Sequence, residues 1–223
     1  MKEHPILFNG EMVRAILEGQ KMQTRRPINP QPQGGHCASM ADDGIWAVLT
    51  EIGWGGEFAC NEIGHCPYGI PGDRLWVRET WQAWEDPETG QDYLRYRADG
   101  AKIVPDWPNT EEAWGRLCGY FDRWCPSIHM PHWASRITLE VTDVRVERVQ
   151  EIWTDHKESS DPWCDIFAEG IPQEAVWDGT GAMPTPLSLF IQLWNSIYAK
   201  RGLGWDTNSW VWVVEFRHTE EAT

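Results

Sequence analysis

The chain has few basic residues for its length. Its 223 residues include 19 Lys and Arg against 34 Asp and Glu, which gives a net charge of −15. Phosphate backbones are bound mainly by Lys and Arg that displace counterions, so most of this surface should repel a long nucleic acid. Because electrostatic potential is local, a basic pocket mouth remains compatible with this balance. The charge therefore favours a small or locally presented substrate.

Long hydrophobic runs are also missing. No stretch approaches the roughly 20 apolar residues that span a membrane. The start of the chain, Met1 to Phe8, has neither a basic beginning nor an apolar run. We therefore expect a cytoplasmic protein with no membrane partner. The length allows one sizeable core, so we expect a single domain over residues 1–223. Both a monomer and an oligomer are compatible with this expectation.

Common catalytic and metal-binding motifs are absent. The chain has no Gly-rich phosphate loop, no G-x-S-x-G and no H-E-x-x-H. Its six cysteines include no C-x-x-C pair, and reduced thiols are expected without a secretory signal. Cys37, Cys60 and Cys66, with the neighbouring His36 and His65, leave a zinc knuckle as an alternative. We expect no metal and no other cofactor.

Tryptophan, in contrast, is abundant. Sixteen are spread from Trp46 to Trp212. A Trp side chain presents a large flat face, so a Trp-rich pocket is suited to stacking a planar ring. The alternative is that most of these side chains simply pack the core.

The order of apolar patterns predicts an α+β protein: strand, helix, several strands, helix, strand. Thr185 and Pro186 are typical of a helix start, and Gly202 of a helix end. An irregular insertion is expected at about residues 98–126. The predicted strands are residues 6–8, 45–52, 75–81, 93–97, 136–149 and 209–217, and the predicted helices follow Asn9 and Thr185.

The strand at residues 136–149 contains a change of face. Its apolar residues keep one parity up to Val141 and the other from Val144. A shift of one residue predicts a bulge or a sharp bend near Thr142 and Asp143. Bends of this kind let a sheet curl, so we expect a β-barrel with flanking helices.

Several stretches, taken in order, resemble a known family. Residues 18–26, EGQKMQTRR, look like a G-x-K-x-x-T-x-R element after the first helix. Residues 71–73, PGD, lead into a strand that contains Val77-Arg78-Glu79, and a closing strand at residues 211–216 follows a long helix. This set resembles the ASCH family, a branch of the PUA-like barrels. Residues 130–136, MPHWASR, resemble its longer phage and prophage members.

The resemblance implies a pocket for a nucleoside or a modified base. Some small bacterial members are amidohydrolases that remove the acyl group from N4-acetylcytidine with a Lys, a Thr and a later Glu. Lys21 and Thr24 match the first two, Glu169 is the best match for the third, and Glu174 is the fallback. Other members are thought to bind RNA or modified bases without cutting them, and a ribonuclease activity has been proposed for some. A non-catalytic binding module and a ribonuclease therefore remain alternatives.

The chemistry of this set makes specific demands. A Thr24 hydroxyl is inert until a base within about 3 Å takes its proton. Lys21 can be that base only if burial or nearby cations such as Arg25 and Arg26 lower its pKa. In an extended segment Lys21 and Thr24 would not share a face, so a turn or bulge would be required. The alternative is a solvated polar strand edge.

Further candidates combine Arg with aromatic neighbours. Arg beside an aromatic wall can hold a phosphate or a base edge. A structural Arg–Glu pair is the alternative. The candidates for substrate binding are Arg25, Arg26, Trp76, Arg78, Glu79, Trp133, Ser135 and Arg136.

Overall fold

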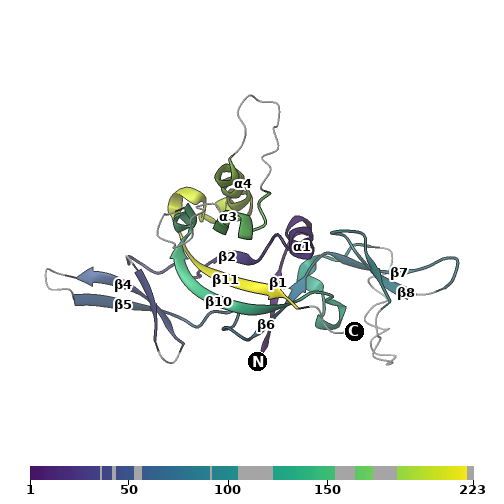
Figure 1. Cartoon of the computed structure of the whole chain (residues 1–223), viewed down its shortest axis with the longest axis horizontal. Helices are drawn as coiled ribbons and strands as arrows, with labels where there is room; N and C mark the ends of the chain where they lie inside the picture. The colour runs from purple at the N-terminus through teal and green to yellow at the C-terminus, as the bar shows by residue number, and fades with distance from the viewer. Residues whose placement is uncertain are drawn as a thin grey trace.

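The computed structural model describes residues 1–35, 37–41, 44–52, 57–90, 92–104, 123–153, 164–172 and 185–219. Within these ranges the protein is α+β, with mostly strands and few helices (Figure 1). None of the helices described is long and apolar enough to cross a membrane. The elements are β1 (Glu3–Leu7), α1 (Gly10–Leu17), β2 (Gln23–Pro27), β3 (Cys37–Met40), β4 (Trp46–Ile52), β5 (Glu57–Gly64), β6 (Arg74–Arg78), β7 (Trp81–Glu85), β8 (Asp92–Tyr96), β9 (Lys102–Ile103), β10 (Thr138–Arg148), η3 (Val149–Trp153), α3 (Cys164–Ala168), α4 (Pro186–Tyr198), η4 (Ala199–Arg201) and β11 (Trp210–His218).

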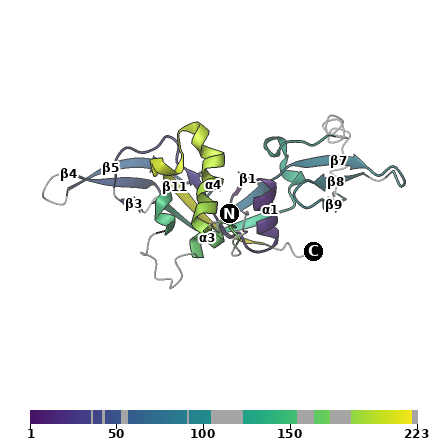
Figure 2. The same ribbon diagram turned by 90° about the horizontal axis from the view of Figure 1, so that it is seen from above.

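The strands form one central sheet and two smaller ones. The central sheet has the order β1–β6–β10–β11–β2, with β1 and β6 parallel and the other pairs antiparallel. The sheets β3–β4–β5 and β7–β8–β9 extend from its two ends (Figure 1). Viewed from above, α1, α3 and α4 lie between these two smaller sheets (Figure 2). The two smaller sheets therefore extend outwards on either side of the helices.

The central strand β11 is buried on both faces. Trp212 and Val214 belong to a core cluster that also contains Ile6 and Phe8. Val211 and the next alternate residue, Val213, pack with Phe190, Trp194 and Tyr198 of α4. Successive strand residues point to opposite faces, so this one strand supplies two cores. An almost continuous apolar run is the expected sequence for such a strand.

The predicted bend in β10 is confirmed. The register between β10 and β11 shifts between Val141 and Asp143, which makes Thr142 the extra residue of a bulge. The bend does not close the sheet, however: β1 and β2 are the edges of the five described strands. The α+β class is therefore correct, and the closed barrel is not seen.

Contacts at the edge of β2 account for the open sheet. Just before β2, Lys21 forms an antiparallel bridge with Glu169, and Met22 donates its N–H to Ala168 O at 2.8 Å. The Arg26 side chain, and not a strand ladder, reaches β1, where it donates to Leu7 O at 2.6 Å. The end of α3 and one arginine thus occupy the place of a closing strand pair.

The predicted helices agree with the structure at their ends. Asn9 accepts a hydrogen bond from Met12 N at the start of α1, and Thr185 accepts one from Ser188 N at the start of α4. After η4, Gly202 adopts a left-handed conformation with φ of 74°. These are local signals, which sequence patterns carry well.

Two predictions around residues 75–126 need correction. The single strand expected over residues 75–81 is interrupted at Glu79 and Thr80, so that β6 ends in the central sheet and β7 begins another. The stretch expected to be irregular from residue 98 contains β9, which pairs with β8. Residues 105–122 of that segment lie outside the described ranges.

The alternation of buried and exposed side chains along β1 provides a test of the core. Ile6 is 1% exposed and its neighbour Leu7 is 40% exposed. Ile6→Ala should lower the free energy of unfolding by roughly 2–5 kcal/mol, because it leaves a cavity in the core. Leu7→Ala is the matched control and should cost less than about 1 kcal/mol. Urea unfolding measures both, and similar losses would contradict the assignment of faces.

Candidate functional site

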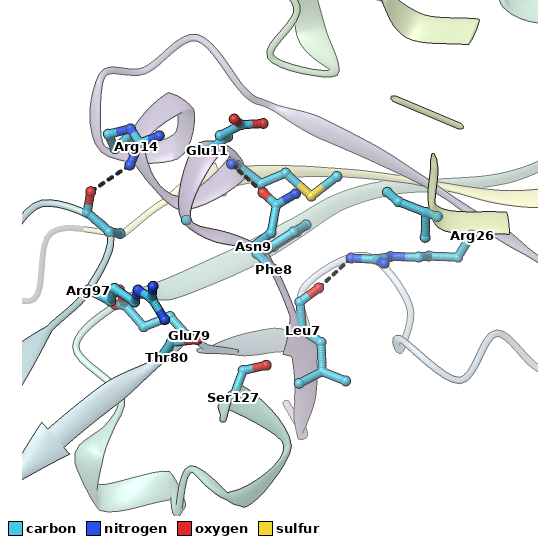
Figure 3. Close-up of a pocket in the computed structure, with 14 residues that line it drawn as sticks. Leu7, Phe8, Asn9, Glu11, Arg14, Arg26, Glu79, Thr80, Arg97 and Ser127 are labelled. Carbon is cyan, nitrogen blue, oxygen red and sulfur yellow. Dashed lines mark hydrogen bonds between the residues drawn. The ribbon is translucent and has the colours of Figure 1, made fainter. Parts of the chain in front are cut away.

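Two adjoining cavities lie along α1. A cavity of ≈ 680 Å³ is formed by the end of β1, the first turn of α1, Arg26, the Glu79–Thr80 break and Ala98 (Figure 3). A second cavity of ≈ 420 Å³ lies between α1 and α4 and reaches Glu169. Both are lined by Met12, so the two cavities adjoin.

Lys21 and Glu169 meet at the edge of the second cavity. The Lys21 ammonium donates to Glu169 O at 2.8 Å, to Glu169 Oε2 at 3.0 Å and to Gln23 O at 2.8 Å. Its side chain is fully buried, and that of Glu169 is 6% exposed. The structure therefore brings together two candidate catalytic residues that are 148 positions apart. An alkylammonium has three N–H donors, and here each has an acceptor.

Burial is the main influence on the Lys21 ammonium and lowers its pKa. The carboxylate of Glu169 opposes this effect, since an adjacent negative charge stabilises the ammonium. Arg26 and Arg25 add to the lowering through charge repulsion. The net result is a pKa below the ordinary lysine value, as a lysine base requires.

Arg25 holds the other side of Glu169. Its Nη1 donates to Glu169 Oε1 at 3.1 Å, and its Nη2 donates to Asp165 at 2.9 Å and to Glu147 at 3.1 Å. The guanidinium is fully buried among these three carboxylates. Arg25 thus orients Glu169 from inside the protein and does not line either of the two cavities.

Thr24 and Arg26 lie on the opposite face of β2 from Arg25. Thr24 is paired with Val214 and Arg26 with Trp212, whereas Arg25 is paired with Val213. Directly opposed residues of antiparallel strands share a face. Thr24 therefore faces the Phe8 side of the sheet, and Lys21 directs its three hydrogen bonds elsewhere. The structure brings Lys21 to Glu169 but does not join Lys21 to Thr24.

The Phe8 ring is a common neighbour of the two faces. Arg26 Cζ lies 5.2 Å and Lys21 Nζ 5.7 Å from its centroid. Lys21 and Thr24 are each only 2% exposed. The alternative of a solvated strand edge is therefore wrong for this polar segment.

The Glu79–Arg136 pair is structural in its geometry. Arg136 donates to both carboxylate oxygens of Glu79, at 2.8 and 3.1 Å, and also to Asp99 at 2.8 and 3.0 Å. Its Cζ lies 4.2 Å from the Tyr96 ring centroid. Burial raises the pKa of Glu79 in spite of Arg136. Glu79 lines the larger cavity, but its charge is already compensated.

The remaining substrate-binding candidates lie around another hollow, of ≈ 380 Å³. It is lined by Trp76, Trp133, Ser135 and Arg136 but shares no lining residue with the larger cavity. Ser135 donates its hydroxyl to Val77 O at 2.8 Å. Arg78 donates to Ile128 O and lies 5.3 Å from the Trp76 ring centroid. The predicted set is thus divided between separate places and does not form one site.

Of the fourteen residues that line the larger cavity, only Arg26 and Glu79 were predicted from the sequence as site residues. The residues that were missed include Phe8, Arg14 and Arg97. They come from the end of β1, from α1 and from the end of β8. No motif links them. The position of Arg14 on the polar face of a short amphipathic helix was the one available signal.

Cys37, Cys60 and Cys66, the cysteines of the alternative zinc knuckle, lie among the described residues. Among the described residues no three His, Cys, Asp or Glu side chains are grouped to hold a metal ion. Cys37 and Cys60 are exposed. Burial raises the pKa of Cys66 to about 12, which keeps it a thiol. His36, Cys118 and Glu174 lie outside the described residues.

Comparisons with known proteins gave no relatives. The chain matches no protein-family profile, no curated protein sequence and no solved structure.

Gly170 allows the close approach of α3 to Lys21. Its φ is +83°, and a Cβ there would lie 2.9 Å from Ala15 Cβ and 3.1 Å from Lys21 Cβ. Gly19, with φ of +71°, has nothing within 4 Å and is the matched control. Both Ala variants should lose about 1–2 kcal/mol to backbone strain, and Gly170→Ala a further 1–3 kcal/mol or so to overpacking. Equal losses in urea unfolding would show that no tight contact exists.

The pKa of Lys21 can be measured directly. Glu169→Gln removes the charge that opposes the effect of burial, so the pKa should fall further. NMR titration of lysine side chains labelled with ¹³C at Cε reports it. Glu140→Gln, which breaks an exposed pair with Arg217, should leave Lys21 unchanged. A rise in the Lys21 pKa in the Glu169 variant would contradict the assigned pairing.

Proposed function

We propose that this protein is an amidohydrolase that removes the acyl group from N4-acylated cytosine nucleosides. The supporting observation is the buried Lys21–Glu169 pair beside two adjoining cavities. The ASCH resemblance assigns catalytic roles to both residues. An ASCH-like, PUA-related core is part of the proposal, supported by the order β1, α1, the Lys21–Arg26 segment and the closing strand β11 after α4.

The reaction begins at Thr24. Its hydroxyl oxygen attacks the acyl carbon, and its proton passes to the neutral amine of Lys21. Arg26 stabilises the negative charge that forms on the acyl oxygen. The bond from the acyl carbon to N4 then breaks, and the Lys21 proton reaches N4 through Glu169. Water hydrolyses the acyl-Thr24 ester, which yields a carboxylic acid and restores the hydroxyl.

This route requires Lys21 to release one of its acceptors and turn towards Thr24. The approach of its ammonium to Phe8, on the Thr24 side of the sheet, supports such a movement. Loss of the proton weakens the hold of Glu169, because a neutral amine is not an ionic partner. The lowered pKa of Lys21 makes the neutral form accessible at a lower pH than for an ordinary lysine.

The larger cavity suits a nucleoside. Its ≈ 680 Å³ falls within the range of roughly 300–1,000 Å³ that is typical of small-molecule sites. Phe8 offers an aromatic ring, and Asn9, Thr80 and Ser127 offer polar groups (Figure 3). A planar base with hydrogen-bonding edges fits this combination of residue types.

A binding module that performs no chemistry is the second candidate. One observation favours it: the three hydrogen bonds of Lys21 all go to Gln23 and Glu169, and none goes to Thr24. In that case Lys21 fixes the wall of a pocket for RNA or a modified base. Variants of Lys21, Thr24 and Glu169 distinguish the two candidates.

The test is hydrolysis of N4-acetylcytidine, with cytidine measured by chromatography. Lys21→Met, Thr24→Val and Glu169→Gln should each reduce kcat/KM by about 10²-fold or more, because each removes a group that handles the nucleophile or its proton. Glu140→Gln should retain activity. Inactivity of the wild type on several N4-acyl cytidines would reject the hydrolase. Nucleoside binding that is equal in the wild type and Thr24→Val would then support the binding module.

A further inference from the structure

Three cations lie on one face of the sheet β7–β8–β9. Arg95 of β8 is directly opposite Lys102 of β9, so the two share a face. Arg97 follows Arg95 by two residues and continues the same face. Arg97 also donates its backbone N–H to Thr80 O at 2.9 Å, which extends the ladder to this position. Arg95, Arg97 and Lys102 are called the basic row below.

Aromatic rings hold the basic row in place. Arg95 Cζ and Arg97 Cζ lie 5.6 and 5.8 Å from the Trp124 ring centroid, and Lys102 Nζ lies 4.8 Å from that of Tyr93. These distances are within the range of about 6 Å for cation–π attraction. Such contacts orient a cation without neutralising it.

Among the described residues, no carboxylate compensates the basic row. The acidic pair of these strands, Glu85 and Asp92, has the parity of Leu94 and therefore belongs to the opposite face. Within the described part of the chain, no residue of the row forms an ion pair. Arg25, Arg136 and Arg145 each contact at least two carboxylates. In a chain of net charge −15, the row is a local reversal of sign.

The basic row continues into the larger cavity. Arg97 lines this cavity together with Arg14 and Arg26 (Figure 3). Arg14 donates to Ala98 O at 2.7 Å and Arg26 to Leu7 O at 2.6 Å, and both acceptors are backbone carbonyls. A hydrogen bond to a neutral carbonyl leaves the charge of the guanidinium available to an anion. Cations therefore extend from β9 to the cavity.

We propose that the basic row binds the phosphates of a single-stranded nucleic acid and leads one of its bases into the larger cavity. The substrate of the proposed hydrolase is then an N4-acylated cytosine within a polynucleotide. A base can enter a pocket only when it is unstacked, and a single strand costs the least to unstack. Positive grooves flanked by aromatic rings are typical of proteins that bind single strands. Only the chemical step of this inference rests on the proposed function.

Fluorescence anisotropy tests the binding with a fluorescently labelled single-stranded oligonucleotide of about 12 nucleotides that contains no modified base. Arg95→Gln/Lys102→Gln should weaken binding of the single strand roughly tenfold at low salt. The variant should also flatten the plot of log affinity against log salt by about 1.4, because each lost phosphate contact contributes about 0.7. Lys200→Gln/Arg201→Gln on η4 changes the net charge equally and is the matched control.

The control should bind like the wild type. A charge-preserving variant, Arg95→Lys/Lys102→Arg, should restore the salt dependence, and thermal melting should confirm that each variant folds. No binding by the wild type at low salt would overturn the inference. So would equal weakening by the two Gln variants, or tighter binding of the corresponding duplex.

Hydrolysis separates this inference from the proposed function. With an oligonucleotide that contains one N4-acetylcytidine, Arg95→Gln/Lys102→Gln should lower kcat/KM roughly tenfold yet leave free-nucleoside hydrolysis unchanged. Hydrolysis of the nucleoside without oligonucleotide binding would reject the proposed role of the basic row but not the proposed hydrolase activity. Oligonucleotide binding with no hydrolysis of either substrate would reject the hydrolase activity but not the role of the basic row.

Discussion

The buried contact between Lys21 and Glu169 is the interaction on which the site depends. A buried ammonium costs several kcal/mol unless it is paired and hydrogen-bonded, and Lys21 meets both conditions within the protein. Arg25 holds the second oxygen of the same carboxylate. Loss of Glu169 would leave two buried cations close together without their shared partner. The contact therefore fixes the end of α3 against the edge of β2.

That contact limits strand pairing at the edge of the central sheet. Because Glu169 and Ala168 occupy the backbone beside Lys21 and Met22, the segment entering β2 is not available to another strand. The bulge in β10 bends the sheet towards closure. Among the hydrogen bonds of the described residues, only that of the Arg26 side chain then reaches from β2 to the end of β1. A side chain takes less space than a strand ladder, and the larger cavity lies beside it.

The sequence predicted the features that depend on local residues. The change of face in β10 and the helix cap at Thr185 each depend on residues only a few positions apart, and the structure contains both. The break after Arg78 was not predicted because its cause is remote. Glu79 donates its backbone N–H to the Met130 sulfur at 3.2 Å and binds Arg136, and Trp81 pairs with Cys125. An alternating pattern cannot record partners that are some 50 positions away.

The candidate site likewise contains some residues that the sequence predicted and others that it did not. A motif selected Lys21 and, through a resemblance, Glu169, but no motif indicated Arg14 or Arg97. Their importance comes from what surrounds them. Carboxylates surround Arg25 and Arg136, whereas the described hydrogen bond of Arg14 goes to a backbone carbonyl and Arg97 lies beside an aromatic ring. Electrostatic potential depends on this local compensation and not on net charge. An acidic protein can therefore present a cationic path, because its excess carboxylates neutralise the arginines that build the fold.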